Sequence, residues 1–357
     1  MVVERGSHTF AEITSQPEVW TKAVAAFWQQ SEALKTLWRE GGFERVLFTG
    51  CGSTHYLSLA GAALFQQLTG INSRAYPASE IALYPDGVFL PNVKTLLITV
   101  SRSGETTETV QAVRVFRERM GSLVIAVTCA STSTLSLHAD LNFSIDDAQE
   151  TSLAQTRSFA SMLIVVEAIA ASIAGRGNLD TLAALTPTVT RLFSEYGSLA
   201  KELGENRQIE RFFFLGSGAL YGIASEAMLK MKEMSLSYSE AFHVLEFRHG
   251  PMSMVDDHSL VVGLLSDEVH PQEIAVLRQM SQRGAQILAL AELDHDLGIA
   301  SGAHLVQIAS GLPAWARPVT YLPVLQLMAY YRALSNGQNP DLPANLSFVI
   351  SLDTSMT

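Results

Sequence analysis

The chain has 357 residues, 48% of them hydrophobic, and a formal net charge of −11 at pH 7. This length and apolar content suffice for two domains of ordinary size. The acidic balance and the lack of any lysine- and arginine-rich run argue against nucleic-acid binding, and no run of about eighteen uncharged apolar residues predicts a membrane span.

The N-terminal region lacks the features of a targeting segment. Residues 1–20 contain acidic side chains and no apolar core, so we expect neither a signal peptide nor a transit peptide. Cys51 and Cys129 are the only cysteines, and neither stands in a CxxC or CxxH pattern. We therefore expect a cytoplasmic protein with no disulfide framework and no metal site.

The chain contains an internal repeat of short apolar runs. The matching pairs are 45–53 with 211–219, 95–101 with 259–266, and 121–128 with 284–291. Three runs that recur in the same order at nearly constant spacing indicate a duplicated domain. Each run is continuous and bounded by small or polar residues, which is typical of a strand buried on both faces.

Helical patterns separate these runs. After Ser103, apolar residues recur at helical spacing as far as Met120, with acidic residues early and arginines late, an order that suits a helix dipole. Strands that alternate with helices predict a parallel sheet covered by helices on both faces. The sequence therefore predicts two tandem three-layer α/β/α domains.

We place the domain boundaries where the pattern changes. We expect an N-terminal helical segment at 1–29, a first α/β domain at 30–185, a second at 195–350 and a tail at 351–357. A helix within 181–206 would link the two domains.

Two strand-to-helix turns of the first domain are rich in hydroxyl groups, namely 50–54 (GCGST) and 101–106 (SRSGET). Each follows a predicted parallel strand, at the edge where ligands bind, and each opens a helix whose free N–H groups attract an anion. The hydroxyls that could hold a phosphate belong to Ser53, Thr54, Ser101, Ser103 and Thr106. Ordinary helix capping by Ser103 and Thr106 is the alternative.

In the second domain, Glu226, Lys230 and Glu233 share one stripe of a predicted helix that is otherwise mostly apolar. The stripe could be a solvent-exposed face on which Glu226 and Lys230 form an i,i+4 pair. His249, in the nearby segment EFRHGP, favours catalysis. A carboxylate can move a proton between adjacent carbons of a sugar while an imidazole serves the ring oxygen, and Lys230 would keep Glu233 ionised.

Together these segments resemble the sugar isomerase (SIS) family, duplicated in tandem. The resemblance runs from AEITSQP at 11–17 to residue 346 and rests on CGST, SRSGET, LKMKE at 229–233 and EFRHGP. Members of this family include the isomerase half of glucosamine-6-phosphate synthase, amino-sugar-phosphate deaminases and tagatose-6-phosphate ketose–aldose isomerase-like proteins. The resemblance implies flavodoxin-like parallel sheets and a reaction without a cofactor.

The resemblance also implies a role for each matching residue. The residues that would hold the phosphate are Ser53, Thr54, Ser101, Arg102, Ser103 and Thr106. Arg102 stands where the family often has glutamine. Glu233 would be the base that forms the enediol, with Lys230 beside it, and His249 would open the sugar ring. The residues that would line the sugar pocket are Gly52, Leu153, Gln155 and Glu226. Because the family's histidine usually comes from a second subunit, we expect a homodimer with shared active sites.

Two departures from the synthase bear on the reaction. We find no segment that matches its glutamine-hydrolysing domain, so we expect no ammonia from glutamine. The lysine with which the synthase captures a keto sugar is replaced by Phe348. EFRHGP and the residues after it are closer to the branch of deaminases and tagatose-phosphate isomerase-like proteins.

The expected activity is proton transfer between C1 and C2 of a hexose 6-phosphate or a 2-amino-hexose 6-phosphate. The protein would be a deaminating isomerase if ammonia is released and an aldose–ketose isomerase if it is not. The alternatives are a deglycase of a phosphorylated Amadori adduct and a non-catalytic sugar-phosphate-binding regulator. Glu233 and His249 together favour catalysis, because phosphate binding needs neither.

Overall fold

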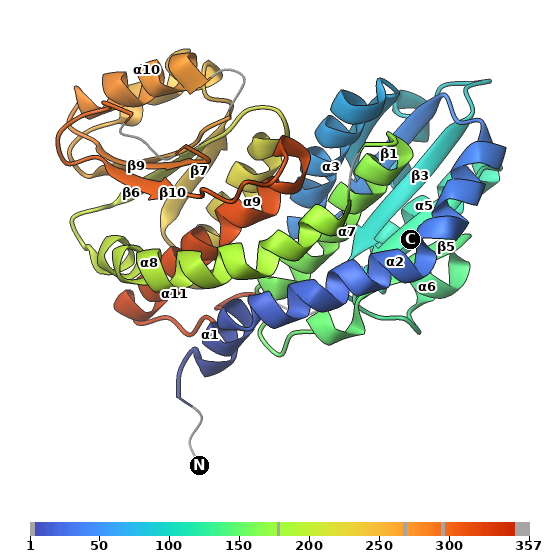
Figure 1. The fold of residues 1–357 in the computed structure, drawn as a ribbon, viewed down its shortest axis with the longest axis horizontal. Helices are drawn as coiled ribbons and strands as arrows, with labels where there is room; N and C mark the ends of the chain where they lie inside the picture. Colours follow the sequence, from blue (N-terminus) through green and yellow to red (C-terminus); the bar gives the residue numbers. More distant parts are fainter. Residues whose placement is uncertain (1–3, 177–178, 267–269, 294–296, 347–357) are drawn as a thin grey trace. The chain divides into compact units, whose positions relative to one another are not determined.

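The computed structural model describes residues 4–176, 179–266, 270–293 and 297–346. Within this part the chain divides into two compact units (Figure 1). The N-terminal unit contains residues 18–150 and 157–180. The C-terminal unit contains residues 4–17, 151–156 and 181–346. The chain thus passes between the units at several points, because residues 4–17 and 151–156 belong to the C-terminal unit.

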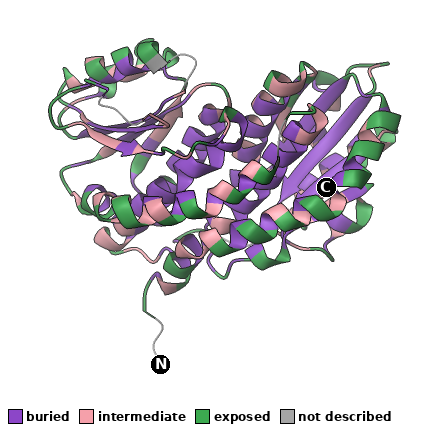
Figure 2. Ribbon diagram, in the orientation of Figure 1, coloured by how far each residue is buried: buried purple, intermediate pink, exposed green. Residues whose placement is uncertain are grey.

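The N-terminal unit is built on a parallel sheet in the order β2-β1-β3-β4-β5. Its strands are β1 Arg45–Gly50, β2 Asn72–Pro77, β3 Thr95–Ser101, β4 Val124–Thr128 and β5 Leu141–Ser144. The three predicted strands of this domain are therefore present as β1, β3 and β4. All three are buried along their whole length, as continuous apolar runs require (Figure 2).

Helices cover both faces of this sheet. They are α2 Gln16–Gly41, α3 Ser53–Thr69, α4 Ala78–Leu83, α5 Thr107–Met120, α6 Thr134–His138 and α7 Arg157–Ile173. Residues of α4, α5 and α6 pack in one apolar cluster against Leu47 and Leu97. On the other face, Phe48 contacts Phe65 of α3, and α3 packs on α7. The three-layer arrangement predicted from the sequence is confirmed.

The C-terminal unit repeats this topology, with the parallel order β7-β6-β8-β9-β10. Its strands are β6 Arg211–Leu215, β7 Tyr238–Phe242, β8 Ser259–Leu264, β9 Gln286–Ala291 and β10 His304–Gln307. Because β6 corresponds to β1 and β8 to β3, both sheets have the flavodoxin-like order 2-1-3-4-5.

The helices of this unit are α1 Ser7–Thr14, α8 Leu185–Glu205, α9 Ala219–Ser235, α10 His270–Ser281 and α11 Leu322–Ser335. Helix α11 packs on α8 and α9 at one face of the sheet, and α10 covers the other face (Figure 1). The predicted helix within 181–206 is present as α8. In the described part of the chain no helix combines the length and the apolar character needed to cross a membrane.

Candidate functional site

The first hydroxyl-rich turn joins β1 to α3 through two glycines. Gly52 has φ 55° and ψ −124°, a conformation that glycine adopts far more readily than other residues. A Cβ on Gly50 would lie 2.5 Å from the hydroxyl oxygen of Thr54. The tight turn therefore depends on small residues at both positions, and it brings buried Ser53 to the first position of α3.

Thr54 uses its hydroxyl within this turn. The hydroxyl donates to the carbonyl oxygen of Cys51 at 2.9 Å and accepts from the N–H of Cys51 at 2.9 Å. Both bonds hold the turn in shape. This geometry favours a supporting role for Thr54. The N–H groups of Thr54, His55 and Tyr56 donate to the carbonyl oxygens of Cys51 and Gly52, so Ser53 remains the candidate of this turn for direct contact with an anion.

The second turn joins β3 to α5. The Ser101 hydroxyl accepts from the N–H of Gly104 at 3.0 Å, and the Ser103 hydroxyl accepts from the N–H of Glu105 at 3.2 Å. Thr106 occupies the N-cap position of α5, yet its side chain makes no capping bond. A serine hydroxyl that accepts one bond still carries a proton that it can donate to a phosphate oxygen. The observed local bonds and a phosphate site are therefore compatible.

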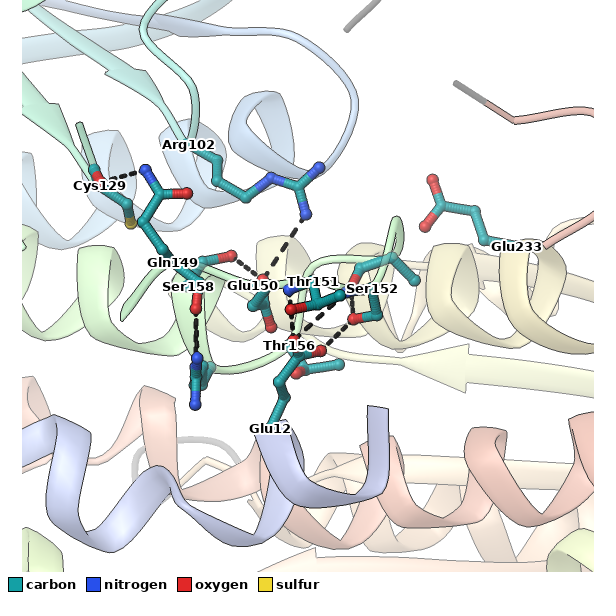
Figure 3. A network of polar contacts seen from close by, with 12 residues as sticks. Glu12, Arg102, Cys129, Gln149, Glu150, Thr151, Ser152, Thr156, Ser158 and Glu233 are labelled. Atoms are coloured by element: carbon teal, nitrogen blue, oxygen red, sulfur yellow. Dashed lines mark hydrogen bonds and ion pairs between the residues drawn. The ribbon is translucent and has the colours of Figure 1, made fainter. Parts of the chain in front are cut away.

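Arg102 is buried in the same turn and forms an ion pair that the sequence did not predict. Its Nη1 lies 3.7 Å from Oε2 of Glu150, and neither side chain is more than 6% exposed (Figure 3). The Glu150 carboxylate also accepts a hydrogen bond from Ser158. Because a buried carboxylate balances the guanidinium, the pair adds less positive charge to the turn than a free arginine would.

The segment 151–156, which carries the predicted pocket residues Leu153 and Gln155, belongs to the C-terminal unit and is held by Glu12. The carboxylate of Glu12 accepts from the N–H of Thr151 at 2.5 Å, from the N–H of Ser152 at 3.2 Å and from the Ser152 hydroxyl (Figure 3). The carbonyl oxygen of Asp341 accepts from the N–H of Leu153 at 3.0 Å. Side chain and backbone bonds thus fix this segment on both sides.

Leu153 and Gln155 are both half-buried. The side-chain oxygen of Gln155 is buried and has no hydrogen-bond partner among the described residues. A buried amide oxygen without a partner is unfavourable in the free protein, so it is a candidate contact for a sugar hydroxyl.

The stripe of α9 is largely buried, so the alternative of a solvent-exposed face does not hold. Glu226 and Lys230 are almost inaccessible, whereas the side chain of Glu233 is 21% exposed. The ammonium of Lys230 lies 3.4 Å from Oε1 of Glu226 and forms a second ion pair with Glu233. Lys230 therefore pairs both with the buried carboxylate of Glu226 and with the carboxylate of Glu233, which solvent or a substrate can reach.

The corresponding helix of the N-terminal unit, α3, shows which side chains the fold requires at these positions for packing alone. Counted from the first residue of each helix, Glu226 and Lys230 of α9 correspond to Ala60 and Leu64 of α3. Ala60 and Leu64 are buried apolar residues. Because the fold accepts apolar side chains at these positions, the buried charges of α9 are not a requirement of the architecture.

His249 lies in an exposed turn. It follows the short 3₁₀ helix Glu246–Arg248, and its N–H donates to the carbonyl oxygen of Glu246 at 2.9 Å. Gly250, with φ 118°, and Pro251 end the turn. In the described part of the chain the imidazole makes no hydrogen bond, so its ring is available to a ligand or a second protein chain.

The C-terminal sheet separates His249 from Glu233. Phe247, next to this turn, packs with Phe213 in the apolar cluster that α10 covers. Glu233 belongs to α9, which packs with α11 on the opposite face. No described hydrogen bond or ion pair joins the two residues. The structure brings Glu226, Lys230 and Glu233 together but leaves His249 apart from them within one unit.

Comparison with known proteins assigns the chain to a family. The chain belongs to the SIS domain family, whose model matches residues 43–172 and 207–335. It is 28% identical over 361 residues to the glutamine–fructose-6-phosphate aminotransferase (isomerizing) of Acidithiobacillus ferridurans, covering 96% of this chain and 58% of the relative. With the same enzyme of Legionella pneumophila strain Paris it shares 30% identity over 318 residues, covering 87% of this chain and 51% of the relative. The chain thus spans little more than half the length of these curated relatives.

Solved structures share the fold over nearly the whole chain. The glucosamine-6-phosphate deaminase of Thermotoga maritima matches with a TM-score of 0.74 and 27% identity, covering 93% of this chain and all of that one. The tagatose-6-phosphate ketose/aldose isomerase of Escherichia coli matches with a TM-score of 0.84 and 24% identity, covering 94% of this chain and 95% of that one. Phe348, which the sequence places at the synthase's lysine position, lies outside the described residues.

Proposed function

We propose that the protein is a phosphosugar enzyme that moves a proton between C1 and C2 of an open-chain hexose 6-phosphate or 2-amino-hexose 6-phosphate. The observation that carries this proposal is the buried stripe of Glu226, Lys230 and Glu233. Burying the charges of Glu226 and Lys230 costs several kcal/mol per ion before pairing offsets it, and Glu233 remains 21% exposed beside them. Since α3 shows that the fold does not need these charges, their chemistry is the better explanation for them.

The phosphate would bind at the two hydroxyl-rich turns of the N-terminal unit. Ser101 and Ser103 keep hydroxyl protons to donate, the N-terminus of α5 supplies N–H groups, and α3 and α5 each add the positive end of a helix dipole. Thr106 at the N-cap of α5 would add a third hydroxyl. These donors can bind a dianion without a cluster of lysines.

Glu233 would carry the proton. In the open-chain aldose it takes the C2 proton, an enediol or enolamine forms, and the same carboxylate returns the proton to C1. A plain sugar then becomes the ketose. From a 2-amino sugar an imine results, which water hydrolyses to the ketose and ammonia. Lys230 pairs with the carboxylate of Glu233, and Glu226 holds Lys230 in place.

His249 would open the sugar ring at the active site of a second copy of the chain. The sheet lies between His249 and Glu233 in one unit, and the imidazole is exposed. Mixing Glu233→Gln protein with His249→Ala protein tests this directly. Shared sites predict that the inactive variants regain about a quarter of wild-type activity after subunit exchange, because a mixed dimer contains one intact site. No recovery despite proven exchange would contradict shared sites.

The particular reaction can be determined with a panel of substrates. Ammonia released from glucosamine 6-phosphate or galactosamine 6-phosphate would establish a deaminase. Interconversion of ketose and aldose 6-phosphates without ammonia would establish an isomerase, and release of an amine from a phosphorylated Amadori adduct would establish a deglycase. Binding of these esters without any turnover would contradict the proposed catalysis and identify a sugar-phosphate-binding regulator.

A further inference from the structure

Helix α9 ends in a conformation that its own sequence does not favour. Leu236, the residue after the helix, has φ 56° and ψ 26° in the left-handed region. At the matching position after α3 stands Gly70, with φ 73°, which adopts this conformation without steric cost. The side chain of Leu236 is 55% exposed, so packing does little to compensate. Contacts from elsewhere must therefore hold this end of α9.

Two side chains supply these contacts, one from α11 (Arg332) and one from the residue that follows it (Asn336). Nε of Arg332 donates to the Ser237 hydroxyl at 3.1 Å. Nδ2 of Asn336 donates to the carbonyl oxygen of Ser235 at 2.8 Å and to the Ser237 hydroxyl at 3.1 Å. The Ser235 hydroxyl also lies 3.0 Å from that of Ser237. The residues on both sides of Leu236 are thus tied to α11.

The guanidinium of Arg332 is itself fixed from several sides. It donates to the carbonyl oxygens of Asn206 and Ile209 at 2.8 and 2.6 Å and lies over the ring of Phe212 at 5.3 Å. The side chain is buried, and it forms no ion pair with any described residue. Three acceptors in different directions suit the planar fork of arginine, and a lysine could not reach all of them.

We propose that Arg332 and Asn336 are positioning residues for Glu233. This inference rests on the proposed role of Glu233 as the proton carrier. Glu233 lies two residues before Ser235, and Lys230 lies one turn earlier on the same helix. Release of the Ser235 and Ser237 contacts would let the last turn of α9 shift and would misplace the carboxylate against the sugar. Small displacements of this kind cost about a hundredfold in rate.

The test compares three variants at a temperature at which all are folded. Arg332→Lys and Asn336→Ala remove contacts to the end of α9. Arg207→Met is the matched control, because Arg207 donates to the carbonyl oxygen of Ser335 at 2.7 Å and forms no hydrogen bond to α9 among the described residues. We expect kcat to fall by about tenfold or more in the first two variants with KM within about twofold of wild type, and the control to keep its kcat.

Amide hydrogen exchange of residues 230–238 supplies an independent measurement. We expect faster exchange in Arg332→Lys and Asn336→Ala and wild-type exchange in Arg207→Met. Unchanged exchange, or faster exchange with unchanged kcat, would overturn the proposal. If the wild type turned over no sugar phosphate, the proposed function and with it the positioning role would fail, while the exchange data would still show whether α11 holds the end of α9.

Discussion

The two units have the same backbone plan at the turn after the first strand of each sheet but different chemistry. Gly52 has φ 55° and ψ −124°, and Gly218 has φ 58° and ψ −131°. A Cβ on Gly50 would meet the carbonyl oxygen of Thr54 at 2.7 Å, and one on Gly216 would meet that of Leu220 at 2.3 Å. The glycines therefore serve the fold in both units.

The side chains at this turn differ. The N-terminal unit has Ser53 and Thr54 where the C-terminal unit has Ala219 and Leu220. The turn after β8 also differs from its counterpart after β3. In the turn after β8, Glu273 accepts from the N–H of Ser266 at 2.7 Å. A carboxylate of the chain lies there, where a phosphate would be repelled. The comparison teaches that the two units share the scaffold, while the N-terminal unit has hydroxyls at these turns and the C-terminal unit has paired charges on α9.

The largest effect should come from Glu233, one of the charged residues that distinguish α9 from α3. Glu233→Gln removes the proposed proton carrier and should lower kcat by about a thousandfold, because a positioned general base contributes that order of rate. Affinity for the phosphate ester should stay within about threefold, since the variant leaves the hydroxyl-rich turns intact. Steady-state kinetics and calorimetric titration measure the two quantities. A variant with more than a tenth of wild-type kcat would refute the assignment of Glu233.

Lys230→Met tests whether the buried charges of α9 depend on one another. The substitution leaves Glu226 buried without its cation, so the free energy of unfolding should fall by about 3 kcal/mol. Leu64→Met, at the matching position of α3, is the control and should cost less than about 1.5 kcal/mol. Urea unfolding measures both. Equal small losses would mean that Lys230 contributes nothing to the stripe.

The hydroxyl-rich turns can be compared with their counterparts in the same way. Ser101→Ala combined with Ser103→Ala should weaken binding of the sugar phosphate by about a hundredfold, because each hydroxyl loses a bond to a charged group. Ser217→Ala and Ser266→Ala alter the matching turns of the C-terminal unit and should leave affinity unchanged. An affinity insensitive to the first pair, or sensitive to the second, would place the phosphate elsewhere.

The smallest effect concerns the ends of the two matching helices. Gly70→Ala forces a Cβ into the left-handed region and should destabilise the protein by about 1 kcal/mol. Leu236→Gly relieves the same strain and should raise the free energy of unfolding by up to about 1 kcal/mol, less the greater entropy of glycine in the unfolded chain. Thermal unfolding of both variants provides the check. A destabilised Leu236→Gly variant would show that the Leu236 side chain makes a stabilising contact.

Much of the fold could be predicted because the inner strands are continuous apolar runs. Strands at the edges of the sheets are not continuous apolar runs and could not be predicted in this way. β2 reads NSRAYP and β7 reads YSEAF, and both are largely exposed or half-buried, so neither has the composition of a buried strand. The repeat therefore revealed three strands per domain, while the outer strands became visible only in the structure.

The candidate site was predictable where the residues proposed to carry the chemistry lie close together in the sequence. The spacing of Glu226, Lys230 and Glu233 on one helix was sufficient to group them, although their burial was not. Glu12 was missed as a site-forming residue because its partners, Thr151 and Ser152, are 139 and 140 residues away. Glu12 lies in the segment AEITSQP, on which the family resemblance partly rested. Nothing in that segment indicates which loop the carboxylate of Glu12 holds.

Proton exchange at the sugar is the most direct test of the central claim. Glucosamine 6-phosphate and the corresponding hexose 6-phosphates would be incubated with the protein in D₂O, and deuterium at C1 and C2 followed by NMR. We predict that the wild type introduces deuterium and that Glu233→Gln, which still binds the ester, does not. Equal exchange in both proteins would assign the base to another residue. No exchange by a wild-type protein that binds these sugars would contradict the proposed catalysis.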